Sequence, residues 1–195
     1  KCDPGCIYKL NKSNNKIELS KKHYSLQSYS EKNRKIITKQ YFSEMFHETF
    51  KYSIEKRLRV DVPYTLLLSG GIDSSYLLCI LVNELNIKPV CYTLLEEGDP
   101  DIENVRYLTN HFNLELNLIT PPIDFSKFYI DALQKLDIPI YDAAYFSLYY
   151  IISHIPSNYK VIFCGDGADE LFLSYSDSKL LEKNTNYYNI VFHIA

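Results

Sequence analysis

The hydrophobic pattern of the chain alternates between short apolar runs and segments with helical spacing. Continuous apolar runs of strand length predict β-strands buried on both faces at residues 64–68, 90–94, 114–119 and 161–164. Apolar residues at helical spacing predict helices at residues 40–58, 74–85, 101–112, 125–136 and 143–155. Because strands and helices largely alternate from residue 64 onward, we expect an α/β fold with a mostly parallel sheet and helices on both of its faces.

The first part of the chain lacks this pattern. Residues 11–39 are polar and rich in Lys, Asn and Ser without a sustained apolar period, which predicts an irregular, partly mobile lead-in. With 195 residues, of which 46% are hydrophobic, the chain has room for about one domain. We therefore expect a lead-in or linker over residues 1–39 and one domain over residues 40–195. Residues 192–195 carry no Gly or Pro stop signal, so we expect that domain to be truncated at its carboxyl-terminal end.

Charge and hydropathy narrow the class of partner. The 21 Lys and Arg residues against 24 Asp and Glu residues give a net charge of -3, without a basic stripe, so neither nucleic acid nor a membrane is an expected partner. The most apolar stretch, residues 141–155, is too short to span a bilayer and instead predicts a buried helix. The five cysteines are scattered and the chain shows no signal-peptide pattern, so we expect reduced thiols and a cytoplasmic location.

Glycine is concentrated after two of the predicted strands, where four of the six glycines stand. After the first strand comes the run Ser69-Gly70-Gly71-Ile72-Asp73-Ser74-Ser75, which opens a helix. Glycines allow the backbone to approach a ligand, and the first helix N–H groups together with the Ser69, Ser74 and Ser75 hydroxyls can bind a phosphate. Asp73 would repel that phosphate unless a divalent cation lay between them, which implies Mg2+. The alternative without a ligand is a glycine turn with Asp73 as the helix cap.

The second glycine cluster follows the last predicted strand, in the run Cys164-Gly165-Asp166-Gly167-Ala168-Asp169-Glu170-Leu171-Phe172. The carboxylates of Asp166, Asp169 and Glu170 would repel one another and stay ionised only with help from a cation, which Asp73 and Asp169 could share. The alternative is a metal-free acidic turn or a solvated helix amino terminus. Parallel sheets bind ligands beyond the carboxyl ends of their strands, so function is to be sought at these two clusters.

These motifs resemble those of a known family. The segments 57–63, 68–75, 136–142 and 166–172, with Pro4-Gly5 near the start of the chain, are similar to the synthetase domain of asparagine synthetases. The loop at residues 69–75 alone would also admit other N-type ATP pyrophosphatases, which make NAD, GMP, argininosuccinate or tRNA lysidine. The motif at residues 166–172 narrows the resemblance to asparagine synthetases, and this implies an adenine nucleotide alpha hydrolase-like (PP-loop) fold.

The resemblance also implies a reaction and the residues that perform it. An ATP-dependent amidoligase of this kind adenylates a carboxylate, by default that of aspartate, releases pyrophosphate and forms an amide with ammonia. The implied nucleotide-binding residues are Leu67, Ser69, Gly70, Gly71, Asp73, Ser74, Ser75, Leu94, Cys164 and Gly165. The implied Mg2+ ligands are Asp73 and Asp169, and the implied catalytic residues are Asp166 and Glu170.

The chain also departs from the family pattern. Cys2 follows Lys1 and is not the nucleophilic terminal cysteine of a glutaminase domain, so we expect ammonia as the nitrogen donor unless a glutaminase or another partner subunit completes the enzyme. No residue matches the family's carboxyl-terminal lysine, and Leu173-Ser174-Tyr175 replaces the usual Gly-Gly-Tyr. The alternatives are a catalytically impaired ATP-binding remnant or partner module, and a ligase that forms beta-lactams or macrolactams.

Overall fold

The computed structural model describes residues 2–23, 38–58, 61–95, 98–122, 124–135 and 143–172. The chain divides into two compact units, one made of Lys1–Phe50 with Gly167–Ala195 and the other of Lys51–Asp166. Several segments singled out in the sequence lie outside the described residues: 24–37, 59–60, 136–142, 173–175 and 192–195. The predicted boundary at residue 40 between a lead-in and a single domain stays a prediction.

The second unit is built on a sheet of four strands, all paired in parallel. The strands are β3 (Tyr64–Leu67), β4 (Val90–Leu94), β5 (Leu116–Ile119) and β6 (Val161–Phe163), in the spatial order β5-β4-β3-β6. Thr65 of β3 pairs with Val90 of β4 on one side and with Ile162 of β6 on the other. The predicted parallel α/β class is therefore confirmed, and the strand order reverses between β3 and β6, where such sheets bind ligands.

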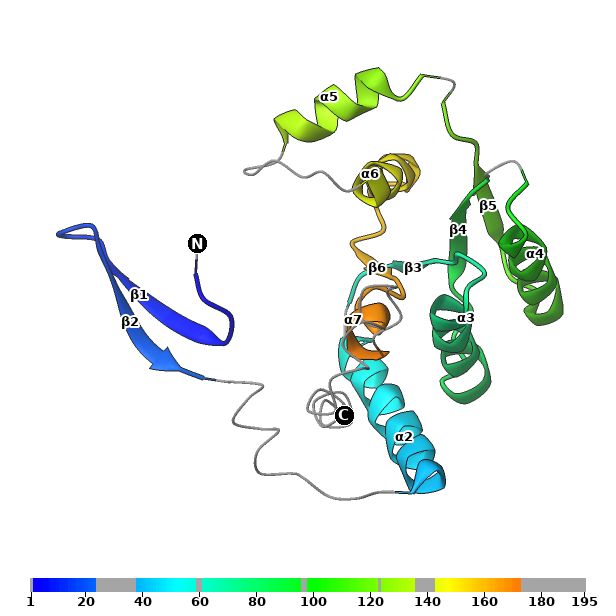
Figure 1. Cartoon of the computed structure of the whole chain (residues 1–195), viewed down its shortest axis with the longest axis horizontal. Helices are drawn as coiled ribbons and strands as arrows, with labels where there is room; N and C mark the ends of the chain where they lie inside the picture. Colours follow the sequence, from blue (N-terminus) through cyan, green and yellow to red (C-terminus); the bar gives the residue numbers. More distant parts are fainter. Residues whose placement is uncertain are drawn as a thin grey trace, which may run out of the picture. The chain divides into compact units, whose positions relative to one another are not determined.

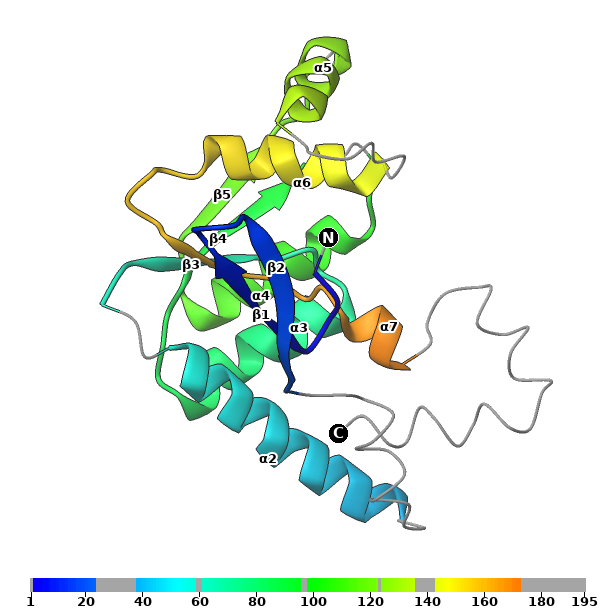
Figure 2. The same cartoon turned by 90° about the vertical axis from the view of Figure 1, so that its left-hand side faces the viewer.

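Helices cover both faces of this sheet (Figure 1). On one face lie α3 (Ile72–Cys79), which continues into the π-helical turn η1 (Ile80–Glu84), and α4 (Asp101–Phe112). On the other face α6 (Ala143–His154) contacts β4 and is packed in turn against α5 (Ser126–Gln134) (Figure 2). The predicted helices are confirmed to within two residues at their ends when η1 is counted as the continuation of α3, because the sequence predicted one helix over residues 74–85 and did not predict its π-helical part.

The core of the second unit lies between the sheet and these helices. Its most deeply buried large side chains come from β3 and the residue after it, from α3, η1, β4 and α4: Leu66, Leu68, Leu78, Leu81, Cys91 and Val105. Fully burying an aliphatic side chain contributes about 1.5–3 kcal/mol, so this group fixes the sheet against α3 and α4. The prediction of a buried helix at residues 141–155 was too broad, because in α6 the buried side chains are Phe146 and Tyr150, one turn apart on a single face.

The first unit begins with an antiparallel hairpin of β1 (Cys6–Asn11) and β2 (Lys16–Lys22). The predicted irregular lead-in is therefore wrong for residues 11–22. The turn between the strands places Asn15 in the left-handed region with φ of 51°, a conformation that Asn tolerates better than most residues.

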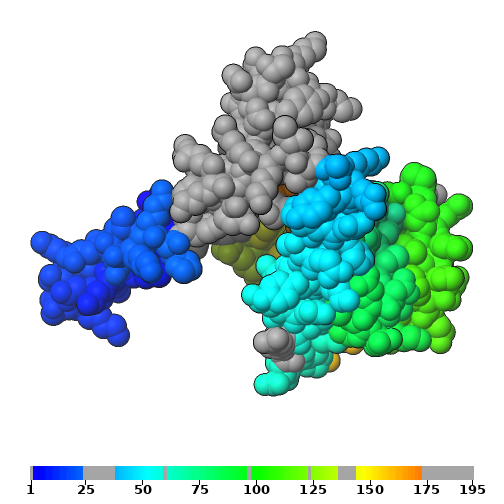
Figure 3. Space-filling view, turned by 90° about the horizontal axis from the view of Figure 1, so that it is seen from below, coloured from blue at the N-terminus to red at the C-terminus, as the bar shows by residue number. Residues whose placement is uncertain are grey.

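One face of this hairpin is apolar and exposed. Tyr8 pairs with Leu19 and Leu10 pairs with Ile17, which places all four side chains on the same face. Leu10, Ile17 and Leu19 are each more than half exposed, and the blue hairpin side chains are visible at the surface in Figure 3. Apolar and polar residues therefore alternate between the two faces of β2, but neither face of this strand is buried.

Helix α2 (Lys39–Arg57) spans the division between the units, and it confirms the helix predicted at residues 40–58. In the first unit, the ring of Phe46 meets that of Phe172 edge to face with centroids 5.3 Å apart, which holds α7 (Ala168–Phe172) against α2. In the second unit, Ile54 is buried and Lys51 forms an ion pair with Glu84 at 3.1 Å. Within the described ranges, no helix is long and apolar enough to cross a membrane.

Candidate functional site

The loop between β3 and α3 is closed by hydrogen bonds among its own hydroxyl and backbone groups. The Ser69 N–H donates to Ser74 Oγ at 3.2 Å, and the two serine hydroxyl oxygens lie 2.9 Å apart. The Gly71 N–H donates to Ser69 Oγ at 3.3 Å, and the Ser74 hydroxyl donates to the Gly71 carbonyl at 3.3 Å. Ser74 is 3% exposed, whereas Ser69 is exposed. These hydrogen bonds restrain the loop, and a restrained loop loses less conformational entropy when it binds a ligand.

The first turn of α3 supplies the anion-binding character of this loop. Gly71 is the N-cap, with φ of -69° and ψ of 167°, and no side chain caps the helix. The alternative in which Asp73 is the cap is therefore wrong, because Asp73 lies inside the first turn. The Ser75 N–H already donates to the Gly71 carbonyl at 3.1 Å. In general the N–H groups of the first turn of a helix point out of its end, and with the helix dipole they favour a negatively charged group there.

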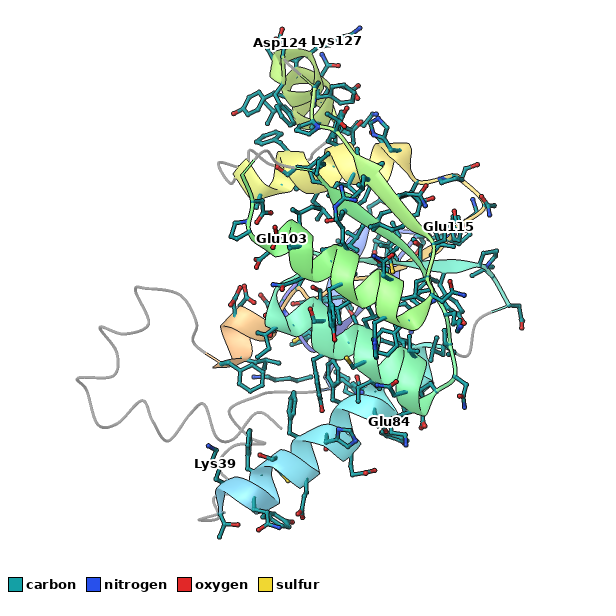
Figure 4. The ribbon with its side chains drawn as sticks, turned by 90° about the vertical axis from the view of Figure 1, so that its right-hand side faces the viewer. Lys39, Glu84, Glu103, Glu115, Asp124 and Lys127 are labelled. Carbon is teal, nitrogen blue, oxygen red and sulfur yellow. The ribbon has the colours of Figure 1, made fainter. Side chains whose placement is uncertain are left out.

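Gly70 is the point where the loop contacts α4. Its φ of 84° lies in the left-handed region, and a Cβ built on it would lie 2.3 Å from the Asp101 carbonyl oxygen. Only glycine satisfies both conditions. In Figure 4 the label Glu103 marks the first turn of α4 and Glu84 the far end of η1, so the amino termini of α3 and α4 lie at the same edge of the sheet.

The segment after β6 packs against the loop. A Cβ built on Gly165 would lie 3.1 Å from the Ser74 nitrogen and 3.2 Å from Asp73 Cβ. The pairing of β6 with β3 brings Gly165, just after β6, against the loop in this way. Cys164 is half-buried, and burial is the main cause that raises the pKa of its thiol, with the neighbouring Asp166 as a further influence. Asp166 itself is exposed.

The remaining nucleotide-binding candidates lie along the same edge of the sheet. Leu67 and Leu94 are the last residues of β3 and β4, and both are half-buried. Just beyond β3, the Leu68 N–H donates to the Tyr92 carbonyl at 2.9 Å, so these two strand ends stay in register. The structure therefore brings together, within the second unit, every nucleotide-binding residue proposed from the sequence, at the carboxyl ends of β3, β4 and β6.

The metal and catalytic carboxylates divide between the two units. Asp73 and Asp166 belong to the second unit, whereas Asp169 and Glu170, in the first turn of α7, belong to the first. A metal ion shared by Asp73 and Asp169 therefore stays a prediction. In the described part of the chain no three His, Cys, Asp or Glu side chains are grouped so that they could hold a metal ion. Mg2+ commonly takes one or two carboxylates and completes its shell with phosphate and water oxygens, so this donor pair fits Mg2+ only together with a phosphate ligand.

Sequence reasoning missed two residues of α4 that contact the loop. The Asn104 side-chain amide lies 3.5 Å from the Gly70 carbonyl oxygen, and Gly70 rests on the Asp101 backbone. The signal that could have found them is their place on the first turns of the helix after β4, because helices that follow neighbouring parallel strands begin at the same edge of a sheet.

Comparison with known proteins agrees with this site. The family model described as asparagine synthase matches residues 45–190, a range that includes both the loop after β3 and the segment after β6. The chain belongs to the asparagine synthase family. Membership in the asparagine synthase family and the strand order β5-β4-β3-β6 together confirm the expected adenine nucleotide alpha hydrolase-like fold class.

Individual relatives in the asparagine synthase family match a limited part of their own length. The glutamine-hydrolyzing asparagine synthetase of Bos taurus is 32% identical over 137 residues, which cover 65% of this chain and 24% of that protein. A probable glutamine-hydrolyzing asparagine synthetase of Acanthamoeba polyphaga mimivirus is 30% identical over 177 residues, which cover 86% of this chain and 31% of that protein. For asparagine synthetase 1 of Bacillus subtilis the identity is 25% and the match covers 20% of that protein. The chain thus spans less than a third of the length of these relatives.

Two solved structures are also similar to this member of the asparagine synthase family. The NH3-dependent NAD synthetase of Campylobacter jejuni, in complex with a nitrate ion, shows 18% identity and a TM-score of 0.42, and the match covers 72% of this chain and 62% of that one. The NMN synthetase of Francisella tularensis shows 17% identity and a TM-score of 0.44, and the match covers 78% of this chain and 59% of that one.

Proposed function

We propose that the chain provides the ATP-binding part of an amidoligase that adenylates a carboxylate, releases pyrophosphate and forms an amide with ammonia. The observation that carries this proposal is the close approach of Gly165 to Ser74 and Asp73. This contact brings the segment that directly follows β6 against the amino terminus of the helix that the first family motif opens, whereas either segment alone would be compatible with an ordinary glycine turn. Aspartate is the default carboxylate substrate in this proposal, because the relatives are named asparagine synthetases and asparagine is the side-chain amide of aspartate.

The residues of the loop bind the phosphates in this proposal. The N–H groups of the first turn of α3 and the hydroxyls of Ser69, Ser74 and Ser75 donate hydrogen bonds to phosphate oxygens. The backbone at Leu67, Leu94 and Gly165 accommodates adenosine in this proposal, because Leu67 and Leu94 end their strands beside the loop and Gly165 follows β6 closely. Positioning and neutralisation of charge supply most of what displacement at a phosphoryl group requires, and a preordered loop suits that task.

The carboxylates act on the cation and on the reacting groups. Asp73 and Asp169 would hold Mg2+, which when bound neutralises phosphate charge. Asp166 and Glu170 are exposed, so a substrate can reach both carboxylates. In this proposal they contact the carboxylate substrate or the incoming ammonia and orient it toward the phosphate.

The test is exchange of labelled pyrophosphate into ATP with and without aspartate, beside direct titration of ATP with and without Mg2+. Exchange that depends on aspartate supports the proposal, and Asp73→Asn should weaken binding of ATP in the presence of Mg2+. Glu115→Gln is the matched control, because Glu115 precedes β5 and lies at the opposite edge of the sheet (Figure 4). Binding of ATP without exchange under any carboxylate would overturn the ligase assignment and favour a binding module. Absence of ATP binding would overturn the proposal as a whole.

A further inference from the structure

Asn104 connects α4 to the loop through its side-chain amide. Its Nδ2 atom lies 3.5 Å from the Gly70 carbonyl oxygen and 3.4 Å from Asp101 Oδ1. Because an amide nitrogen carries two hydrogens, Asn104 can donate to both oxygens at once. Gly70 also lies directly against the Asp101 carbonyl, because a Cβ built on residue 70 would be 2.3 Å from that oxygen. The loop and α4 are therefore in contact through both a backbone surface and a side-chain donor.

Holding the Gly70 carbonyl determines the direction of the next amide. In a trans peptide the carbonyl and the following N–H point in opposite directions, and the described chain contains no cis peptide. With the Gly70 carbonyl turned toward Asn104, the Gly71 N–H points away from α4, where it donates to Ser69 Oγ at 3.3 Å. Asn104 therefore sets the orientation on which the hydrogen bonds among Ser69, Gly71 and Ser74 depend.

A peptide between two glycines needs such an anchor. Neither Gly70 nor Gly71 has a side chain to restrain rotation of the peptide that joins them, and glycine adopts positive and negative φ about equally readily. If this peptide turned over, the Gly70 carbonyl oxygen would face the side on which an anion would lie. Its partial negative charge would then oppose the anion that the loop amides attract.

The neighbouring charges explain why an amide suits this position. The first turn of α4 carries Asp101 and Glu103, and the Asp99 carboxylate accepts a hydrogen bond from the Asp101 N–H at 2.9 Å. A carboxylate at residue 104 would add to this negative charge and would repel the Gly70 carbonyl oxygen. The Asn104 amide instead donates to the Asp101 carboxylate and to the loop together.

We propose that Asn104 is a positioning residue for phosphate binding: it fixes the Gly70–Gly71 peptide so that the loop amides, and not a carbonyl oxygen, face a polyphosphate. The identity of the ligand rests on the proposed function, whereas the effect on the loop itself does not. Asn104 lies on a different helix from the loop and acts through Gly70, without touching the ligand.

The proposal is tested by measuring the affinity of three variants for three ligands. The ligands are ATP in the presence of Mg2+, pyrophosphate and adenosine. Asn104→Ala should weaken binding of ATP and of pyrophosphate by about 3- to 10-fold, the range expected for one lost hydrogen bond, and change adenosine binding by less than about 2-fold. Asn104→Asp should weaken pyrophosphate binding further, because it replaces the donor by a charged acceptor. Asn110→Ala, at an exposed position on the same helix, is the matched control and should bind like the unaltered chain.

Amide hydrogen exchange of the ligand-free protein gives a readout that needs no nucleotide. The Gly71 amide should exchange faster in Asn104→Ala than in the unaltered chain or Asn110→Ala. If exchange at Gly71 is unchanged, or if Asn104→Asp binds pyrophosphate normally, the positioning role is overturned. An equal loss of adenosine affinity would also overturn it, because that result indicates general destabilisation. If Gly71 exchange rises but no chain binds ATP, the proposed function fails while the effect of Asn104 on the loop stands.

Discussion

Gly165 and Ser74 approach so closely that a Cβ on residue 165 would lie 3.1 Å from the Ser74 nitrogen. Such a contact is tighter than side chains normally make, and the atom approached is backbone, which yields little. Gly165 therefore packs directly against the first turn of α3, and a methyl group at this position would push the two segments apart. This relationship makes Gly165 a more sensitive probe of the loop than the serines, whose hydroxyls also support the fold.

The variant Gly165→Ala should lose nucleotide affinity with little loss of stability. Gly165 does not have a positive φ, so the backbone tolerates alanine, and the added methyl group needs a shift of a few tenths of an ångström. We expect about a 10-fold weaker Kd for ATP and a cost of about 1 kcal/mol in the free energy of unfolding, at the low end of overpacking costs. Calorimetric titration with ATP and urea unfolding measure the two quantities. An unaltered Kd would show that ATP does not bind beside Gly165.

A comparison of Gly70→Ala with Gly98→Ala should separate backbone strain from packing. The two glycines have nearly the same φ, 84° and 82°, but among the described residues no atom lies within 4 Å of a Cβ at Gly98. Gly98→Ala should therefore cost only the left-handed conformation, about 1–2 kcal/mol. Gly70→Ala should cost at least about 1–3 kcal/mol more, because its methyl group would overlap the Asp101 carbonyl and α4 would have to move. Urea unfolding of both variants measures the difference, and equal losses would mean that α4 does not rest on the loop in solution.

The contact between α5 and α6 should contribute stability over a broad but bounded range of pH. The Tyr149 hydroxyl donates to Asp131 Oδ2 at 2.6 Å, and Lys135 Nζ lies 3.0 Å from the same oxygen. The pKa of Asp131 is lowered, chiefly by the hydrogen bond from Tyr149 and next by the hydrogen bond from Lys135. The pKa of Lys135 is raised, by Tyr149 first and by Asp131 next.

The direction of each pKa shift determines the pH range over which the contact stabilises the folded chain. A lowered acid pKa contributes stability above the unfolded value near 3.9, and this is lost as pH falls through the folded pKa. A raised lysine pKa contributes stability below the unfolded value near 10.4, and this is lost as pH rises through the folded pKa. Tyr149→Phe should therefore lower the midpoint of urea unfolding at neutral pH, and only by a small amount because these groups are exposed. In acid the difference in midpoint between the variant and the unaltered chain should disappear. A difference that persists at about pH 2 would contradict this origin.

Cys164 should report occupancy of the site through its rate of alkylation. Burial raises the pKa of its thiol, so modification by iodoacetamide should be slow at neutral pH and faster as pH rises. ATP should slow it further, because Cys164 directly precedes Gly165. Cys2 is exposed and serves as the unprotected internal reference, while Cys91, with a pKa raised by burial to about 12, should stay unmodified in the folded chain. Equal rates at Cys164 with and without saturating ATP would contradict its place in the site.

The parallel sheet was predictable because its two central strands, β3 and β4, are buried on both faces, whereas the expected burial is wrong for β5, which is half-buried along its whole length. Leu66 and Cys91 are fully buried within uninterrupted apolar runs, and a run of this kind differs in length and composition from the helices around it. The hairpin was missed for the opposite reason. Ile17 and Leu19 alternate with charged and polar residues, but the number of Lys and Asn residues around them hides the alternation when no face is buried.

The site was predictable in its residue types and only partly in its geometry. Glycines after strands pointed to the loop and to Gly165, because few other functions require glycine at a strand end. The roles of Asp101 and Asn104 could not be read from the sequence, since they depend on how closely α4 packs against Gly70. The shared cation of Asp73 and Asp169 depends on a distance between segments far apart in the sequence, and it stays a prediction.

The position of β3 between β4 and β6 also constrains the order in which the chain can fold. Tyr64 pairs with Val161, so one side of β3 is left without a partner until nearly all of the second unit has been synthesised. During that interval β3 is an unprotected edge strand that carries Leu66, which is fully buried in the folded chain, and such edges recruit other chains. The late pairing of β6 with β3 thus exposes the nascent chain to aggregation, and a chain cut short before β6 should be the most severely affected.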